Sequence, residues 1–248
     1  MYMIKQMKNG WGSSFASLLI SPPFGNYIRI PGSKSIKGSF TLEPREGLVP
    51  QIVKTLRFSF EANGWINKIG LRNKGLEYGI KNYNHDTDIL SIAIMNESEI
   101  KPILNMLPKK ANIELNVSCP NVEDELNDNN IGQFLNPERE WCAVKISPLT
   151  RKETIDKYYK LGFRQYHCCN TLRVENGGLS GPSLIPYVCK QIETIKSYPN
   201  TTIVGGGGIQ NMETLNKYKK LGATYFSLSS IFFHPIVCVK FFMRGGRT

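Results

Sequence analysis

The sequence predicts a trimmed (β/α)8 TIM barrel, in which parallel strands close into a ring and helices cover the outside. Short apolar segments alternate with amphipathic segments along most of the chain, as repeated strand–helix units require. About eight strand candidates fall within a chain of one-domain length, which favours a closed barrel over an open doubly wound sheet. We therefore expect residues 1–248 to form a single barrel domain.

The expected elements can be justified in chain order. Apolar runs bounded by turn residues predict strands at residues 14–21, 36–42, 89–95, 111–119, 141–147, 164–170, 201–208 and 223–230. Segments with a helical apolar period predict helices at residues 97–107, 151–162, 181–197 and 210–222, followed by an apolar tail helix. The first helix, between the first two strands, is missing. Residues 45–80 do not alternate, and we expect an excursion with turns there.

Composition limits the partners and the compartment. The formal net charge is +11, but the lysines are spread along the chain, which favours a solvated surface and makes nucleic acid an unexpected partner. The apolar tail at residues 231–243 carries His234, Pro235 and Lys240, and is too short and polar to span a bilayer. Residues 1–12 lack the apolar core of a signal peptide. We expect a soluble, cytoplasmic protein with no membrane partner.

The cysteines indicate a reduced protein without a metal site. None of them forms a C-x-x-C pair, and no histidine lies at ligand spacing. Free cysteines are often buried, so we expect five of them in the core: Cys142, Cys168, Cys169, Cys189 and Cys238. Cys119 differs, because it stands at the end of a strand between Asn116 and Asn121.

The strand ends are chemically rich, and functional groups of barrels collect there. A glycine run at residues 205–208 follows the seventh strand, and Ser229 and Ser230 follow the eighth. Glycines at a helix start let backbone N–H groups approach an oxyanion, so this pair of loops predicts a phosphate site. Lys145 shares its strand face with Ala143 and Ser147. These small residues leave room at the barrel centre, so we expect the lysine to face a ligand rather than reach outward.

Three chemistries suit Cys119: nucleophile, metal ligand or proton-transfer group. A nucleophile needs an activating base, for which His167 is the one candidate near a strand end, and a metal site lacks companions. Proton abstraction from a carbon acid needs a nearby electron sink, which a bound flavin would supply. The carboxamides of Asn116, Asn121 and Asn170 suit a ligand dense in carbonyl and N–H groups, such as a pyrimidine.

From about residue 15 to residue 234 the chain resembles the dihydroorotate dehydrogenase family of FMN-dependent barrels. The resemblance is carried, in order, by "TLEPREG" (41–47), "INKIGLRNKG" (66–75), "ELNVSCPNV" (114–122), "VKISP", "NTL", "GGLSGPSLIP" and "IVGGGGI". The glycine run alone is weak evidence, whereas "NVSCPN", "GGLSGP" and "INKIGLRN" together are specific. Cysteine at position 119 resembles the soluble class, since the membrane-associated class uses serine.

The resemblance implies a role for each matching residue. Cys119 would remove the proton from C5 of dihydroorotate while a hydride passes from C6 to flavin N5, and Lys145 would stabilise negative charge on the reduced ring. The implied substrate-binding residues are Asn67, Gly70, Leu71, Asn116, Asn121, Asn170 and Thr171. The implied FMN-binding residues are Lys145, Gly181, Gly207, Gly208, Ser229 and Ser230, with Lys37 as a further candidate.

The resemblance also bears on partners. "TLEPREG" and "GGLSGP" look most like the subgroup that passes electrons to NAD through an iron–sulfur flavoprotein subunit, and we expect a homodimer. Several features depart from the family. Pro22 and Pro23 replace small residues and cannot donate an N–H. Gly38 stands where the family has a flavin-contacting lysine, one position from Lys37.

The helix that the family has after the "SCPN" loop is nearly gone between residues 136 and 141, and the family's long segment before "GGLSG" is reduced to residues 173–176. These departures leave two alternatives open. One is a non-catalytic, degenerate barrel of the same family. The other is an FMN reductase acting on another pyrimidine such as tRNA uridine, which the net positive charge would suit.

Overall fold

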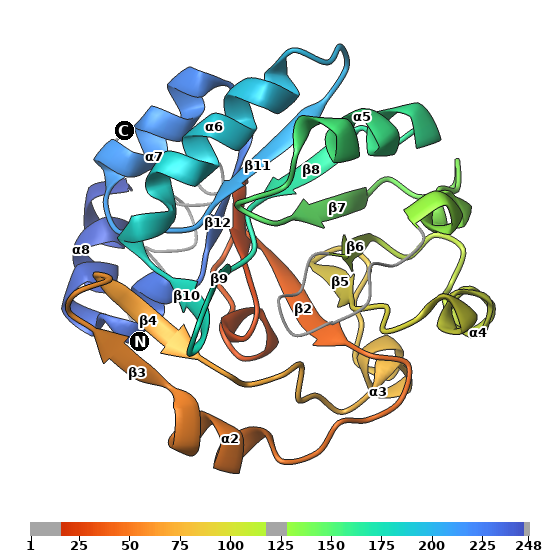
Figure 1. Ribbon diagram of the computed structural model, residues 1–248, viewed down its shortest axis with the longest axis horizontal. Coiled ribbons are helices and arrows are strands. Elements are labelled where there is room, and N and C mark those ends of the chain that lie inside the picture. Colours follow the sequence, from red (N-terminus) through yellow and green to blue (C-terminus); the bar gives the residue numbers. More distant parts are fainter. Residues whose placement is uncertain (1–15, 118–127, 246–248) are drawn as a thin grey trace.

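The computed structural model describes residues 16–117 and 128–245, and its core is a closed parallel barrel (Figure 1). The barrel strands are β1 (Leu18–Ile20), β2 (Lys34–Phe40), β5 (Asp88–Ile92), β6 (Ile113–Asn116), β7 (Cys142–Ile146), β8 (Gln165–Cys168), β11 (Thr202–Gly206) and β12 (Tyr225–Leu228). They neighbour one another in the order β1-β12-β11-β8-β7-β6-β5-β2, and β1 pairs with β2 to close the ring. The predicted (β/α)8 barrel is confirmed.

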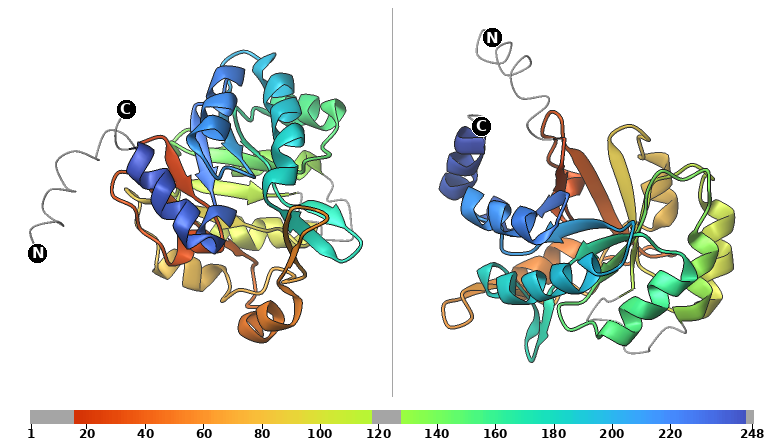
Figure 2. Two further views of the ribbon diagram at one scale, coloured as in Figure 1. Left: turned by 90° about the vertical axis from the view of Figure 1, so that its left-hand side faces the viewer. Right: turned by 90° about the horizontal axis from the view of Figure 1, so that it is seen from above.

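Helices surround the barrel on its outside, as the two further views show (Figure 2). The α-helices are α2 (Leu48–Thr55), α3 (Leu76–Lys81), α4 (Ile100–Met106), α5 (Lys152–Leu161), α6 (Ile185–Lys196), α7 (Met212–Leu221) and α8 (Pro235–Gly245). The sequence sets their limits locally. The Asn211 side chain accepts a hydrogen bond from the Thr214 N–H and caps the start of α7. Gly162, with φ +108°, ends α5 in the left-handed region that glycine favours.

Short 3-10 helices complete several connections. They are η1 (Phe24–Asn26), η2 (Glu97–Glu99), η3 (Asp128–Phe134), η4 (Pro182–Leu184) and η5 (Ser230–Phe233). In the part of the chain that the structure describes, η1 is the one helical turn between β1 and β2, so the expectation of a missing first helix is confirmed. The helices predicted at 97–107 and 181–197 each begin as a 3-10 turn before the α-helix starts.

The barrel interior has an apolar floor and a polar upper layer. Leu19, Ile36, Ile89 and Val204 come from four different strands and pack together as one buried cluster. Because β11 and β5 are not neighbours in the sheet, only the barrel interior can bring their side chains together. Side chains alternate along each strand, so the interior positions that follow in the chain carry polar groups such as Glu114. The upper part of the barrel interior is therefore a polar chamber, which opens at the carboxyl ends of the strands.

A second, antiparallel sheet stands beside the barrel (Figure 1). It has the order β3-β4-β10-β9 and consists of β3 (Arg57–Ser59), β4 (Gly64–Asn67), β10 (Gly177–Ser180) and β9 (Leu172–Val174). The pairing of β4 with β10 brings residues 64–67 to residues 177–180, and so joins two segments far apart in the chain. The expectation for residues 45–80 was incomplete, because that excursion contains α2, β3, β4 and α3. Residues 177–180, for which the sequence predicted no strand, form β10.

Several predicted boundaries were too wide, since tertiary pairing decides where a strand ends. The strands expected at 14–21 and 89–95 run only over Leu18–Ile20 and Asp88–Ile92. The expectation of five core cysteines was partly wrong: Cys142, Cys168 and Cys169 are buried, but Cys189 and Cys238 are only half-buried. No helix in the described part of the chain is long and apolar enough to cross a bilayer.

Candidate active site

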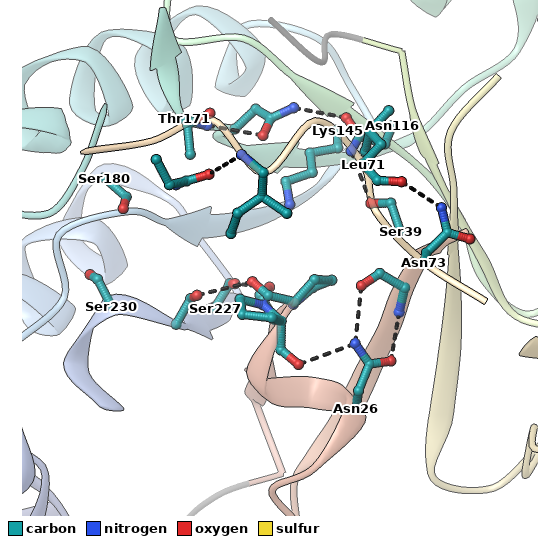
Figure 3. Close-up of a pocket in the computed structure, with 18 of the residues that line it drawn as sticks. Asn26, Ser39, Leu71, Asn73, Asn116, Lys145, Thr171, Ser180, Ser227 and Ser230 are labelled. Atoms are coloured by element: carbon teal, nitrogen blue, oxygen red, sulfur yellow. Dashed lines mark hydrogen bonds between the residues drawn. The ribbon is translucent and has the colours of Figure 1, made fainter. Parts of the chain in front are cut away.

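A pocket of about 440 Å³ opens at the carboxyl ends of the barrel strands (Figure 3). Its volume lies within the range of small-molecule sites. It is lined by every described residue that the sequence predicted for substrate or cofactor, namely Lys37, Asn67, Gly70, Leu71, Asn116, Lys145, Asn170, Thr171, Gly181, Gly207, Gly208, Ser229 and Ser230. The predictions for Cys119 and Asn121 lie outside the described residues.

One side of the pocket is a cradle of glycine and serine backbone, formed by Gly181, Gly207, Gly208, Ser229 and Ser230. Gly207 and Gly208 have φ of +100° and +78°, and a Cβ on Gly208 would lie 2.9 Å from the Gly181 carbonyl oxygen. Glycine is therefore required there on both conformational and steric grounds. Among the described residues, the N–H groups of positions 207, 208, 229 and 230 have no protein acceptor. Such a group of free donors suits an oxyanion.

The opposite side carries a ladder of amide and hydroxyl side chains (Figure 3). Asn170 Nδ2 donates to Asn116 Oδ1 over 2.7 Å, and Asn116 Nδ2 donates to Ser39 Oγ over 2.9 Å. Ser39 Oγ lies 2.8 Å from Ser91 Oγ, and the Thr171 N–H donates to Asn170 Oδ1 over 2.9 Å. The ends of β2, β5, β6 and β8 thus place these polar groups in one connected row.

Three ionisable side chains meet in the barrel beneath this ladder. His167 Nδ1 lies 2.5 Å from Glu114 Oε2, Ser91 Oγ donates to Glu114 Oε1 over 3.0 Å, and Lys145 Nζ is 3.8 Å from Glu114 Oε1. These three side chains and the side chain of Ser91 are all buried. Space for the imidazole depends on Gly206, since a Cβ there would lie 2.7 Å from His167 Nε2.

The charge states of this cluster follow from burial and contact. Burial raises the pKa of the Glu114 carboxyl, but the neighbouring His167 and Lys145 and two hydrogen bonds outweigh burial and lower that pKa to about 2. Burial lowers the pKa of His167, so its ring is neutral at neutral pH and donates its Nδ1 proton to the carboxylate. The chamber therefore holds a carboxylate and an ammonium close together, with a neutral donor behind them.

The loop after β4 is tied to the end of β2 by Asn73. The Asn73 side chain donates to Thr41 Oγ1 over 2.9 Å and to the Leu71 carbonyl over 2.7 Å. Its Oδ1 accepts from the N–H groups of Thr41 and Gly75. This one carboxamide holds the strained Leu71, with φ +56°, at the pocket wall opposite the barrel interior.

Lys37 lines the edge of the pocket, but its ammonium is held elsewhere. Lys37 Nζ lies 2.6 Å from Asp88 Oδ2 and donates to the Asn82 carbonyl. Ile36 and Ile89 point into the barrel, so their neighbours Lys37 and Asp88 point to the helix-covered side. The structure therefore does not bring Lys37 together with Lys145, and its cofactor role stays a prediction.

The two prolines after β1 also line the pocket. The Pro22 carbonyl accepts a hydrogen bond from Ser229 Oγ over 3.0 Å, which ties the first strand end to the cradle. Beneath them, Ser21 and Ser227 share a buried hydroxyl–hydroxyl hydrogen bond. The Ser229 hydroxyl proton is thus used within the protein.

Comparison with known proteins agrees with this geometry. A family model described as dihydroorotate dehydrogenase matches residues 31–243, most of the chain. The chain belongs to the dihydroorotate dehydrogenase family. Its similarity to a catalytic subunit of dihydroorotate dehydrogenase B (NAD(+)) from Bacteroides thetaiotaomicron is 26% identity, covering 95% of this chain and 88% of that protein. Its similarity to dihydroorotate dehydrogenase A (fumarate) from Limosilactobacillus reuteri is 27%, covering 84% and 78%.

A solved structure supports the fold of this family member. Dihydroorotate dehydrogenase from Eimeria tenella, determined in complex with ferulenol, matches with a TM-score of 0.62 over 83% of this chain and 72% of that chain. The sequence identity is 19%, so this likeness concerns the fold alone. The relatives thus include both NAD-linked and fumarate-linked enzymes.

Sequence reasoning missed several members of this dihydroorotate dehydrogenase-like site. Glu114, Ser91 and Ser39 were not singled out, and His167 was considered only as a base for Cys119. A signal for Glu114 existed, because a carboxylate between Ile113 and Leu115 in an apolar strand needs a buried partner. That partner lies 53 residues away along the chain, and only closure of the barrel brings it near.

Proposed function

We propose that this chain is an FMN-dependent dihydroorotate dehydrogenase that oxidises dihydroorotate to orotate, a step of pyrimidine biosynthesis. The observation that carries the proposal is the pairing, within one pocket, of an amide ladder with an oxyanion cradle. Asn116 and Asn170 offer the donors and acceptors that a pyrimidine needs, and Lys145 lies between them and the cradle (Figure 3).

The cradle fits FMN on grounds internal to this chain. Proteins of the family generally bind FMN. Here Gly207, Gly208, Ser229 and Ser230 present N–H donors that have no acceptor within residues 16–117 and 128–245, as a phosphate requires. Gly181 lies beside this cradle with φ +130°, and a Cβ on it would lie 3.1 Å from Gly64 Cα. When bound, FMN would supply the acceptor for the hydride that leaves the substrate.

The chain's own residues would bind the substrate, stabilise charge and transfer the proton. Asn116 and Asn170, with Thr171 and the Asn67 loop, would hold and orient the pyrimidine ring. The Lys145 ammonium would stabilise negative charge at the chamber floor, where burial strengthens electrostatic interactions. Cys119 would take the proton from C5, a role that rests on the "NVSCPN" resemblance.

For the electron acceptor we propose NAD, reached through an iron–sulfur flavoprotein subunit. Support comes from the "TLEPREG" and "GGLSGP" segments and from relatives named as catalytic subunits of NAD-linked enzymes. A homodimer of this chain is part of the same proposal. Co-expression with such a subunit should give a complex that reduces NAD with dihydroorotate.

The first test is an anaerobic visible spectrum of purified protein after FMN addition and desalting. Flavin bands that bleach with dihydroorotate support the proposal. Cys119→Ala should retain the bands and lose the bleaching, whereas Cys238→Ala, a matched thiol change on α8, should behave as wild type. Retained bands that never bleach would refute dihydroorotate as substrate. Colourless protein would refute FMN binding and favour the degenerate barrel.

A further inference from the structure

A buried carboxylate in the barrel chamber has no part in the chemistry proposed above. Glu114 is 1% exposed and sits on an interior position of β6, one layer above the apolar floor. Burying a carboxylate costs several kcal/mol unless charge and hydrogen bonds compensate, and an apolar residue would serve the fold as well. Its partners among the described residues are His167, Ser91 and Lys145. Because burying the Glu114 carboxylate destabilises the fold, we expect this residue to have a function in the pocket.

In the row of hydrogen bonds from Asn116 to Glu114, each group donates toward the carboxylate. An ionised carboxylate only accepts, so Ser91 Oγ must donate to it over 3.0 Å. The single proton of Ser91 is then used, and Ser91 must accept from Ser39 over 2.8 Å. Ser39 has likewise used its proton and accepts from Asn116 Nδ2 over 2.9 Å. The carboxylate thus dictates that the amide nitrogen of Asn116 faces the barrel interior.

The other end of this row gives the same orientation independently. The Thr171 backbone N–H can only donate, so Asn170 must present Oδ1 to it at 2.9 Å. Asn170 Nδ2 then faces Asn116 Oδ1 at 2.7 Å, which again turns the Asn116 nitrogen toward Ser39. The orientation of both carboxamides is therefore fixed from two ends, one of which is Glu114. Their remaining donor and acceptor sites are fixed as well.

We propose that Glu114 is a positioning residue that links the two sides of the pocket. Through Ser91 and Ser39 it sets the orientation of Asn116 and Asn170, and through its charge it holds Lys145. This inference rests on the proposed function, in which the amides bind the pyrimidine and the lysine faces FMN. His167 serves Glu114 as a donor that fixes the carboxylate.

Two substitutions separate the two arms of the link. Ser91→Ala breaks the hydroxyl row but leaves the Glu114 contacts with His167 and Lys145 in place. Glu114→Gln keeps the shape and an acceptor for Ser91, but removes the charge beside Lys145. Ser35→Ala is the matched control, because Ser35 is a buried serine of the same barrel whose Oγ, in the described part of the chain, donates to the Ile28 carbonyl over 3.4 Å and not to the hydroxyl row.

The loaded enzyme should respond differently to the two changes. For Ser91→Ala we expect KM for dihydroorotate to rise about tenfold with kcat within twofold, and the flavin midpoint potential to stay at its wild-type value. For Glu114→Gln we expect a more positive potential, because loss of the negative charge favours the reduced flavin. A tenfold change in that two-electron equilibrium corresponds to about 30 mV. Ser35→Ala should change neither quantity.

A readout that needs no flavin keeps this inference separate from the proposed function. The side-chain amide 15N–1H NMR signals of Asn116 and Asn170 should shift in Ser91→Ala and stay in place in Ser35→Ala. These shifts would support the link even in a protein that dihydroorotate does not reduce, an outcome that refutes only the proposed function. Unchanged amide signals in Ser91→Ala would overturn the link to the amides. A wild-type flavin potential in Glu114→Gln would overturn the link to Lys145.

Discussion

Gly206 offers a direct test of how tightly the chamber is packed around His167. A Cβ added at this position would lie 2.7 Å from His167 Nε2 and 2.8 Å from Ser227 Cβ, closer than real Cβ contacts allow. Overpacking of a core costs about 1–3 kcal/mol, and the lower entropy of the unfolded alanine chain offsets roughly 0.4–1 kcal/mol. The net loss for Gly206→Ala is then on the order of 0–2.6 kcal/mol. For a chain of this size, Tm should fall by up to about 10 °C.

Gly132→Ala is the matched control for this prediction. Gly132 lies in η3, and its added Cβ would meet nothing closer than 3.6 Å, at Leu161. The entropic gain then acts alone, and Tm should stay level or rise by about 1–4 °C. Calorimetric melting of both variants beside wild type measures the difference. A Gly206→Ala protein that melts at or above Gly132→Ala would refute the packing of His167 and Ser227 against this glycine.

Three further predictions concern the base, the cradle and the buried pair. Cys119→Ala should lower the rate of flavin reduction by dihydroorotate at least 100-fold in stopped-flow measurements, and a smaller loss would exclude it as the base. Gly208→Ala, strained at φ +78° and 2.9 Å from the Gly181 oxygen, should raise Kd for FMN at least tenfold by fluorescence titration. The lowered pKa of His167 means that the unfolded chain binds its proton first, so stability should fall as pH drops below about 6.5. The lowered Glu114 pKa extends this loss from about 4.5 down to about 2. Denaturation of His167→Asn across this range should lack the first of these two losses, and an unchanged profile would contradict the neutral histidine.

The barrel could be predicted because each of its parts leaves a local signal. Strands such as Ile113–Asn116 and Cys142–Ile146 are short apolar runs, and the helices that follow carry a clear apolar period. The second sheet left no such signal. Its strands have three or four residues, and β10 begins with Gly177 and Gly178, which sequence patterns assign to turns. Pairing with β4 stabilises these residues as a strand. The expected single domain over residues 1–248 stays a prediction.

The residues of the site also fall into those that the sequence could predict and those that it could not. Residues that line the pocket with their backbone, such as Gly207 and Gly208, could be predicted because a glycine run indicates a conformation that other residues rarely adopt. Residues that act through other side chains could not be predicted, since their partners lie far away in the chain. Glu114 depends on His167 and Ser91, and these distances in sequence are closed only by the barrel. The assignments of Cys119 and Asn121 remain predictions, because both lie outside the described residues.

The local backbone of β2 explains why glycine stands at position 38. Gly38 has φ +120°, and a Cβ there would lie 2.4 Å from the Ser91 carbonyl oxygen, so only glycine fits. The register of β2 against β5 shifts between Lys37 and Phe40, which turns Ser39 toward Asn116. A lysine at position 38 would be excluded by the same backbone. The Ser39 hydroxyl occupies this part of the wall, and through Ser91 it joins the amide ladder to the buried carboxylate. A row of hydroxyls is better suited to ordering a neutral amide than to holding charge.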